Sequence, residues 1–170
     1  MKIKSMLPLI LVLVLLYVSS IFIHGYKNIL RLIFVLAVLY VSSVFIRGYL
    51  WESKAENFLL ESVSDFAKPW NAERLWVYAS DEMRNNPILP PNEFAVAAEG
   101  ELGNLIEIIG GPNCELNSGT HQGSPEKHIY ALCEMTAKFV KKTVHMKIRL
   151  IEIEEGSENS WRIFNFLEIK

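Results

Sequence analysis

Two uncharged apolar stretches at the start of the chain constrain its fold more than any other feature. Residues 7–23 and 32–46 carry no charged side chain, and Arg31 and Arg47 flank the second stretch. A helix rises about 1.5 Å per residue and the hydrocarbon core of a bilayer is about 30 Å thick, so each stretch is just long enough to span it when the flanking arginines reach the interfaces. We predict a membrane anchor over residues 1–50, with helices at about 7–24 and 29–50.

The two stretches are copies of one sequence. LYVSSIFIHGY at residues 16–26 recurs as LYVSSVFIRGY at residues 39–49, which makes a tandem repeat. The simpler interpretation is a duplicated anchor. The alternative is a helical hairpin that packs through small residues, which allow close approach of helices in lipid. Those residues are Ser19, Ser20, Ser42 and Ser43.

A cleavable signal peptide competes for the first stretch, because Lys2 and Lys4 make a basic start and residues 18–20 could serve as a small-residue cleavage site. The apolar run continues through Ile23, which favours retention. Orientation depends on the number of spans. If both stretches span, the count of positive residues places the domain inside the cell. If only the second copy spans, the domain is exported.

Composition limits the function classes open to the rest of the chain. A net charge of −2 offers no basic face for phosphates, so nucleic acid is excluded as a partner. The two cysteines, Cys114 and Cys133, show no metal-ligand spacing, and we predict neither a metal site nor a cofactor. A chain of 170 residues has room for one domain after the anchor, over residues 51–170.

The sequence of the domain predicts three helices followed by four strands. Apolar residues recur at helical spacing over 55–67, and caps at Asn71 and Asn92 begin helices that reach residues 83 and 102. The period then becomes two, with strands at 105–109, 128–139, 144–150 and 161–169. We expect Gly110, Gly111 and Pro112 to close the first strand and residues 117–125 to form a loop. The fold class predicted is α+β with an antiparallel meander.

Several short segments resemble a known superfamily. They are ELGNL at residues 101–105, GPNC at 111–114, the strand from Tyr130 to Phe139, and WRI at 161–163. These look like membrane- or lipid-anchored bacterial domains of the cystatin-like, nuclear-transport-factor-2-like superfamily. The resemblance implies a curved four-stranded sheet that wraps the first long helix into a cone. Its motifs concern packing and are almost silent about chemistry.

Enzymes of this superfamily, such as those that resemble ketosteroid isomerase, place an acid or base at the mouth of the cone. No local motif marks any residue for that role, so we predict no catalytic residue. The nearest candidates are His128, Tyr130, Glu134, His145, Arg149, Glu152 and Asp81.

Two further features have open interpretations. Cys114 and Cys133 either form a disulfide, which would imply an oxidising compartment, or pack as buried free thiols. A basic surface patch could meet anionic lipid or an acidic partner, although lysines on edge strands commonly serve only to discourage pairing. The patch comprises Lys138, Lys141, Lys142, Lys147 and Arg149.

These observations together favour a non-enzymatic module tethered to the bacterial inner membrane. We expect its domain to face the periplasm and to bind a protein partner or a small apolar ligand. Two alternatives are a small isomerase or dehydratase of the same fold, and a cytoplasm-facing regulatory domain on a two-helix anchor.

Overall fold

The computed structural model describes residues 29–120, 127–155 and 158–170. The first apolar stretch, its copy of the repeat and the predicted helix at 7–24 lie outside these residues. The chain divides into two compact units, residues 1–50 and 51–170, and the division falls inside one helix, α2 (Ile29–Phe66). The sequence predicts separate helices on either side of residue 51. A single helix forms instead, because no proline interrupts this segment and Leu, Ala, Glu and Lys are good helix formers.

The apolar part of α2 has the length of a membrane span. Among the described residues, one helical stretch, Val35–Phe66, is long and apolar enough to cross a membrane, with a mean hydropathy of 1.3 over its most apolar window. None of that window is buried within the structure. By length and composition this stretch is weakly consistent with a membrane location.

The second half of α2, residues 51–66, supplies the central helix of the domain. Its buried side chains are spaced three or four residues apart and so form one stripe. The stripe consists of Ala55, Leu59, Ser62, Val63 and Phe66. Neighbours on the other side, such as Leu60, are exposed.

Three shorter helices follow: α3 (Ala72–Tyr78), α4 (Asp81–Arg84) and α5 (Pro91–Leu102). The sequence predicts one helix from Asn71 to residue 83, and that prediction is wrong at Ser80. The backbone N–H of Ser80 donates to the carbonyl of Ile163 at 2.9 Å, while its hydroxyl accepts from the N–H of Met83 and caps α4. A tertiary hydrogen bond therefore divides the helix.

The sheet is antiparallel with strand order β1-β2-β3-β4. The strands are β1 (Leu105–Thr120), β2 (Lys127–Phe139), β3 (Thr143–Glu155) and β4 (Glu158–Ile169). The expected end of the first strand at Gly110 is wrong. Gly110 and Gly111 have φ of 74° and 73°, and the register shifts between Ile109 and Asn113, so the glycines form a bulge within a longer strand.

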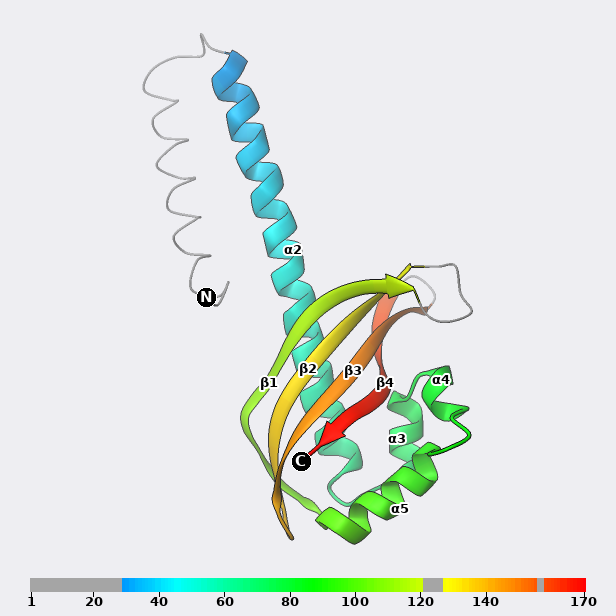
Figure 1. Ribbon diagram of the computed structural model, residues 1–170. Coiled ribbons are helices and arrows are strands. Elements are labelled where there is room, and N and C mark those ends of the chain that lie inside the picture. The colour runs from blue at the N-terminus through cyan, green and yellow to red at the C-terminus, as the bar shows by residue number, and fades with distance from the viewer. Residues whose placement is uncertain (1–28, 121–126, 156–157) are drawn as a thin grey trace. The chain divides into compact units, whose positions relative to one another are not determined.

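Alternation along the strands gives the sheet two distinct faces. On β2, Ala131, Cys133, Met135, Ala137 and Phe139 are buried and share one core with the stripe of α2. We call this the inner face. The alternate residues of β2, such as Tyr130 and Leu132, belong to the outer face. Within residues 51–170, Figure 1 shows α2 running behind the sheet and α3, α4 and α5 gathered toward β4. The predicted α+β class and the four-stranded antiparallel sheet are confirmed.

Aromatic rings fill the space between helices and sheet toward both ends of the domain. Near the end of α2, five rings pack in sequence, with centroid separations between 4.3 and 6.4 Å. They belong to Phe66, Trp70, Phe94, Phe139 and Phe166. Fifteen residues before Phe66, Trp51 packs edge-to-face on Trp161 at 6.1 Å. Among the residues whose burial is described, the fully buried polar side chains are those of Ser62 and Ser80.

Leu59→Ala should destabilise the domain by about 2–5 kcal/mol, because it empties a fully enclosed site in the core. The adjacent Leu60→Ala is the matched control and should change stability by about 0.5 kcal/mol or less, since Leu60 is 40% exposed. Denaturant unfolding of the full-length chain, followed by tryptophan fluorescence, measures both. Equal effects of the two substitutions would contradict the assignment of the buried stripe.

Candidate functional site

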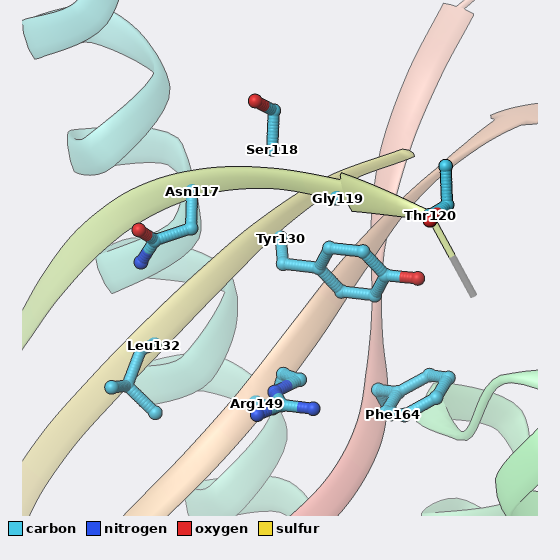
Figure 2. Close-up of a pocket in the computed structure, with 8 residues that line it drawn as sticks. All are labelled: Asn117, Ser118, Gly119, Thr120, Tyr130, Leu132, Arg149 and Phe164. Carbon is cyan, nitrogen blue, oxygen red and sulfur yellow. The ribbon is translucent and has the colours of Figure 1, made fainter. Parts of the chain in front are cut away.

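A pocket of about 280 Å³ lies on the outer face of the sheet. All four strands contribute to it: the end of β1, the start of β2, the middle of β3 and the middle of β4 (Figure 2). Its lining residues are Asn117, Ser118, Gly119, Thr120, Tyr130, Leu132, Arg149 and Phe164. The pocket is therefore built from strand positions that the hydrogen-bonded register holds in place.

Strand register brings the main side chains of the pocket together. Asn117 pairs with Tyr130 across β1 and β2, and Leu132 pairs with Arg149 across β2 and β3. Because residues directly opposite each other share a face, these four side chains project to the same side. Figure 2 shows the rings of Tyr130 and Phe164 beside the guanidinium of Arg149, while Ser118 projects away from them.

Apolar and polar groups alternate around the pocket. The ring of Tyr130 meets that of Phe164 edge-to-face, with 5.7 Å between centroids, and Leu132 adds an aliphatic wall. The polar groups on the side of the two rings are the guanidinium of Arg149, the Tyr130 hydroxyl and the Asn117 amide. Such a mixture of apolar walls and a few convergent polar groups is typical of small-molecule sites.

The phenol of Tyr130 stays protonated at neutral pH. Its pKa is raised above the usual 10, first by burial and then by the negative charge of Glu82 on α4, while Arg149 acts in the opposite direction. Tyr130 therefore offers a hydroxyl that donates or accepts a hydrogen bond, rather than a phenolate base. No Asp, Glu or His is among the described residues that line the pocket.

The next cation on the same strand face has a different environment. Lys147 is two residues before Arg149, and its Nζ lies 2.7 Å from the carboxylate of Glu134. The hydrogen bond and charge of Lys147 lower the pKa of Glu134. His145 also faces Glu134, with 3.8 Å between Nε2 and a carboxylate oxygen. These surface groups form an ion-paired cluster that leaves Lys147 no role in the pocket.

The structure joins Cys114 and Cys133 in a disulfide. The two residues are directly opposite each other on β1 and β2, with 4.0 Å between Cα atoms, and both are buried on the inner face. The sequence places Cys114 after the first strand, whereas the longer β1 includes it. The bridge links the strands that carry Asn117 and Tyr130.

The basic patch expected from sequence is spread over several ion pairs. Lys138 lies 3.5 Å from Glu107, Lys142 lies 3.9 Å from Glu101, and Lys147 pairs with Glu134. Lys141 donates to the carbonyl of Gly100 at the end of α5. Arg149 is the member of the set that lines the pocket.

The residues considered for catalysis lie in different parts of the domain. Tyr130 and Arg149 come together in the pocket, and the ring of His128 lies 6.3 Å from that of Tyr130. Asp81 pairs with Arg84 at 3.2 Å, and Glu134 and His145 belong to the surface cluster. Glu152 lies on β3 opposite Trp161. Among the described residues, no group of His, Cys, Asp and Glu is placed to hold a metal ion.

Sequence reasoning identifies Tyr130 and Arg149 and misses the other six residues that line the pocket. Residues 117–120 fall in the segment predicted to be a loop, and neither Leu132 nor Phe164 is a predicted site residue. The signal for Leu132 was its alternation with the inner-face residues of β2. The position of Phe164 on the outer face depends on a register shift between β3 and β4, where Arg149 pairs with Asn165 and Leu150 pairs with Ile163. No sequence pattern predicts that shift.

A second pocket, of about 240 Å³, lies between α4, α5 and β4. Its lining includes Met83, Phe94 and Phe166 together with the amides of Asn86 and Asn165, and no charged side chain. It lacks the guanidinium and the phenol of the first pocket. We therefore treat the pocket around Arg149 as the candidate site.

No protein-family model, no curated protein and no solved structure matches this chain.

The pKa of Tyr130 should respond to its two charged neighbours in opposite directions. Glu82→Gln should lower the pKa, because it removes the negative charge that disfavours the phenolate. Arg149→Gln should raise it further, because it removes the compensating cation. A pH titration of the ring carbon Cζ of labelled tyrosine by NMR, assigned with Tyr130→Phe, measures the shifts. Shifts of the same sign in both variants would contradict this arrangement of charges.

Proposed function

We propose that the protein is a membrane-tethered, non-catalytic module that binds a small ligand on the outer face of its sheet, on the extracytoplasmic side of a bacterial inner membrane. The observation that carries the proposal is the pocket around Arg149, which combines aromatic and aliphatic walls with convergent hydrogen-bonding groups. The fold we propose for the domain is the cystatin-like cone, in which the sheet curves around the second half of α2. The observed order after residue 51, which is the second half of α2, three shorter helices and four strands, supports it.

Binding is favoured over catalysis by the filling of the interior. A catalyst of the isomerase kind needs an acid or base in an open cavity between helix and sheet. Here that space holds Trp51 and Trp161 near one end and the five packed rings near the other. The pocket lies on the opposite face and contains a protonated phenol as its weakly acidic group.

A membrane tether is supported by α2. Its apolar stretch is not buried within the structure, whereas the core helix of a soluble domain would be. A bilayer would shield these apolar side chains from water. The disulfide between Cys114 and Cys133 supports the extracytoplasmic side, because such bonds persist in oxidising compartments and are rare in the cytosol. The same bond counts against a cytoplasm-facing regulatory domain.

Charges placed in both apolar stretches should release the protein from membranes. Leu15→Arg combined with Leu39→Arg puts one arginine near the centre of each stretch and adds roughly 2.5–3.5 kcal/mol of insertion cost per arginine. The full-length wild type should stay with membranes after alkaline carbonate extraction, and the double variant should move to the soluble or aggregated fraction. Leu60→Arg, an exposed position in the domain half of α2, is the control and should remain bound.

The redox state of the cysteines in cells gives the side of the membrane. After acid quenching, a mass-tagged maleimide should modify the wild type only when a reductant is added first. In a strain that lacks periplasmic thiol oxidation, the tag should attach without reductant. Free thiols in both strains would place the domain in the cytoplasm and overturn the extracytoplasmic assignment.

Ligand binding is tested with a neutral aromatic probe, 4-fluorophenylacetamide, followed by ¹⁹F NMR on the full-length chain in detergent micelles. We expect line broadening beyond that caused by empty micelles. Leu132→Trp should abolish the extra broadening by filling the pocket, whereas Leu167→Trp, at an exposed position on β4, should preserve it. Equal broadening in both variants would rule out binding in this pocket.

A further inference from the structure

The cation of the pocket has no acidic partner among the residues that the structure describes. Other cations of the domain find one: Lys138 pairs with Glu107, Lys147 with Glu134, and Arg74 with Asp65. Arg149 is flanked across the sheet by Leu132 on β2 and Asn165 on β4, neither of which carries a charge. Its guanidinium therefore retains donor capacity that these neighbours do not neutralise.

Arg149 and Lys147 differ in the groups that their side chains face. The two residues lie on the same strand and the same face, two positions apart, and both are partly buried. Lys147 faces a carboxylate, while Arg149 faces the rings and the aliphatic side chain of the pocket. Partly burying a cation without a counter-charge carries a desolvation cost, which an anionic ligand would offset.

We propose that the pocket binds a small monocarboxylate with an aromatic or similarly compact apolar body, and that Arg149 holds the carboxylate. This inference rests on the proposed function, because it names the ligand class of the same pocket. A guanidinium presents two parallel N–H groups that match a carboxylate. The protonated hydroxyl of Tyr130 and the amide of Asn117 supply further donors at the same face (Figure 2).

The charge of the surroundings favours a monoanion over a phosphate. Among the described residues that line the pocket, Arg149 is the one cation, and the negative charge of Glu82 acts on Tyr130 from α4. The charge of a phosphate dianion exceeds that of Arg149 and would be repelled by the carboxylate of Glu82, whereas the charge of a monocarboxylate matches that of Arg149. Glu82 itself is exposed and does not line the pocket.

The dimensions of the pocket fit a compact organic acid. Its volume of about 280 Å³ is near the lower limit for small-ligand sites, and corresponds to roughly nine water molecules at about 30 Å³ each. Tyr130 and Phe164 present aromatic surface for the body of such a ligand, and Leu132 presents aliphatic surface. A ring carrying a short acid chain meets both requirements.

The test compares 4-fluorophenylacetate with its neutral isostere 4-fluorophenylacetamide by ¹⁹F NMR on the full-length chain in neutral or zwitterionic detergent. The wild type should bind the carboxylate at least about tenfold more tightly than the amide, as expected when a charged group gains hydrogen bonds. Arg149→Gln should reduce this ratio to about one, because the carboxylate loses more binding than the amide does, and a denaturant midpoint close to that of the wild type shows that the variant is folded. Arg149→Lys should give an intermediate ratio, since it keeps the charge and loses the planar pair of donors.

Two neighbouring charges provide a second test and a matched control. Glu82→Gln should increase the ratio, because it removes a negative charge near the pocket. Lys147→Gln removes a cation from the same strand and face and should change the ratio by less than about twofold, because Lys147 is already paired with Glu134. A ratio that falls equally in Lys147→Gln and Arg149→Gln would mean that general surface charge, and not Arg149, attracts the anion, and would overturn the inference.

The remaining outcomes separate this inference from the proposed function. If the amide binds in the pocket and the carboxylate binds no more tightly, the pocket is a ligand site but not one for carboxylates, and only the inference fails. If the preference for carboxylate survives in Arg149→Gln, the assignment of Arg149 fails. If neither compound binds, the proposed small-ligand function fails with it.

Discussion

Packing between the buried stripe of α2 and the inner face of the sheet is the interaction on which the rest of the domain depends. Ala55, Leu59 and Val63 are almost wholly enclosed, as are Ala131, Cys133 and Met135 on β2. Once these residues are committed to the core, strand alternation leaves Tyr130 and Leu132 no position except the outer face. The candidate pocket is thus a consequence of how the core is made.

The aromatic residues divide between the two faces of the sheet. Trp70, Phe94, Phe139 and Phe166 stack on one another and close the space between helices and sheet. Tyr130 and Phe164 instead meet on the outer face, beside Arg149. Side chains thus fill the space between helices and sheet, and the candidate pocket lies on the outer face. The proposed binding role rests on this division between the two faces.

Charge pairing explains why Arg149 differs from its neighbours. The register of β2 and β3 sets Glu134 opposite Lys147 and Leu132 opposite Arg149. A register shift of two residues would set Glu134 opposite Arg149 and Thr136 opposite Lys147. The sequence of β3 alone shows only an even alternation of His145, Lys147 and Arg149. Cross-strand pairing, which joins residues distant in sequence, assigns one cation to an ion pair and the other to the pocket.

The sequence by itself determined the apolar character of the start of α2, the existence of the later helices and the period-two strands, because these depend on local composition and spacing. It left the pairing of Cys114 with Cys133 open, it misplaced the end of β1, and it did not predict the break at Ser80. Only tertiary structure decided those points: the glycine bulge extends β1, the hydrogen bond to Ile163 divides the helix, and the strand register selects Arg149. Each depends on contacts between residues far apart in the chain, which no local pattern records.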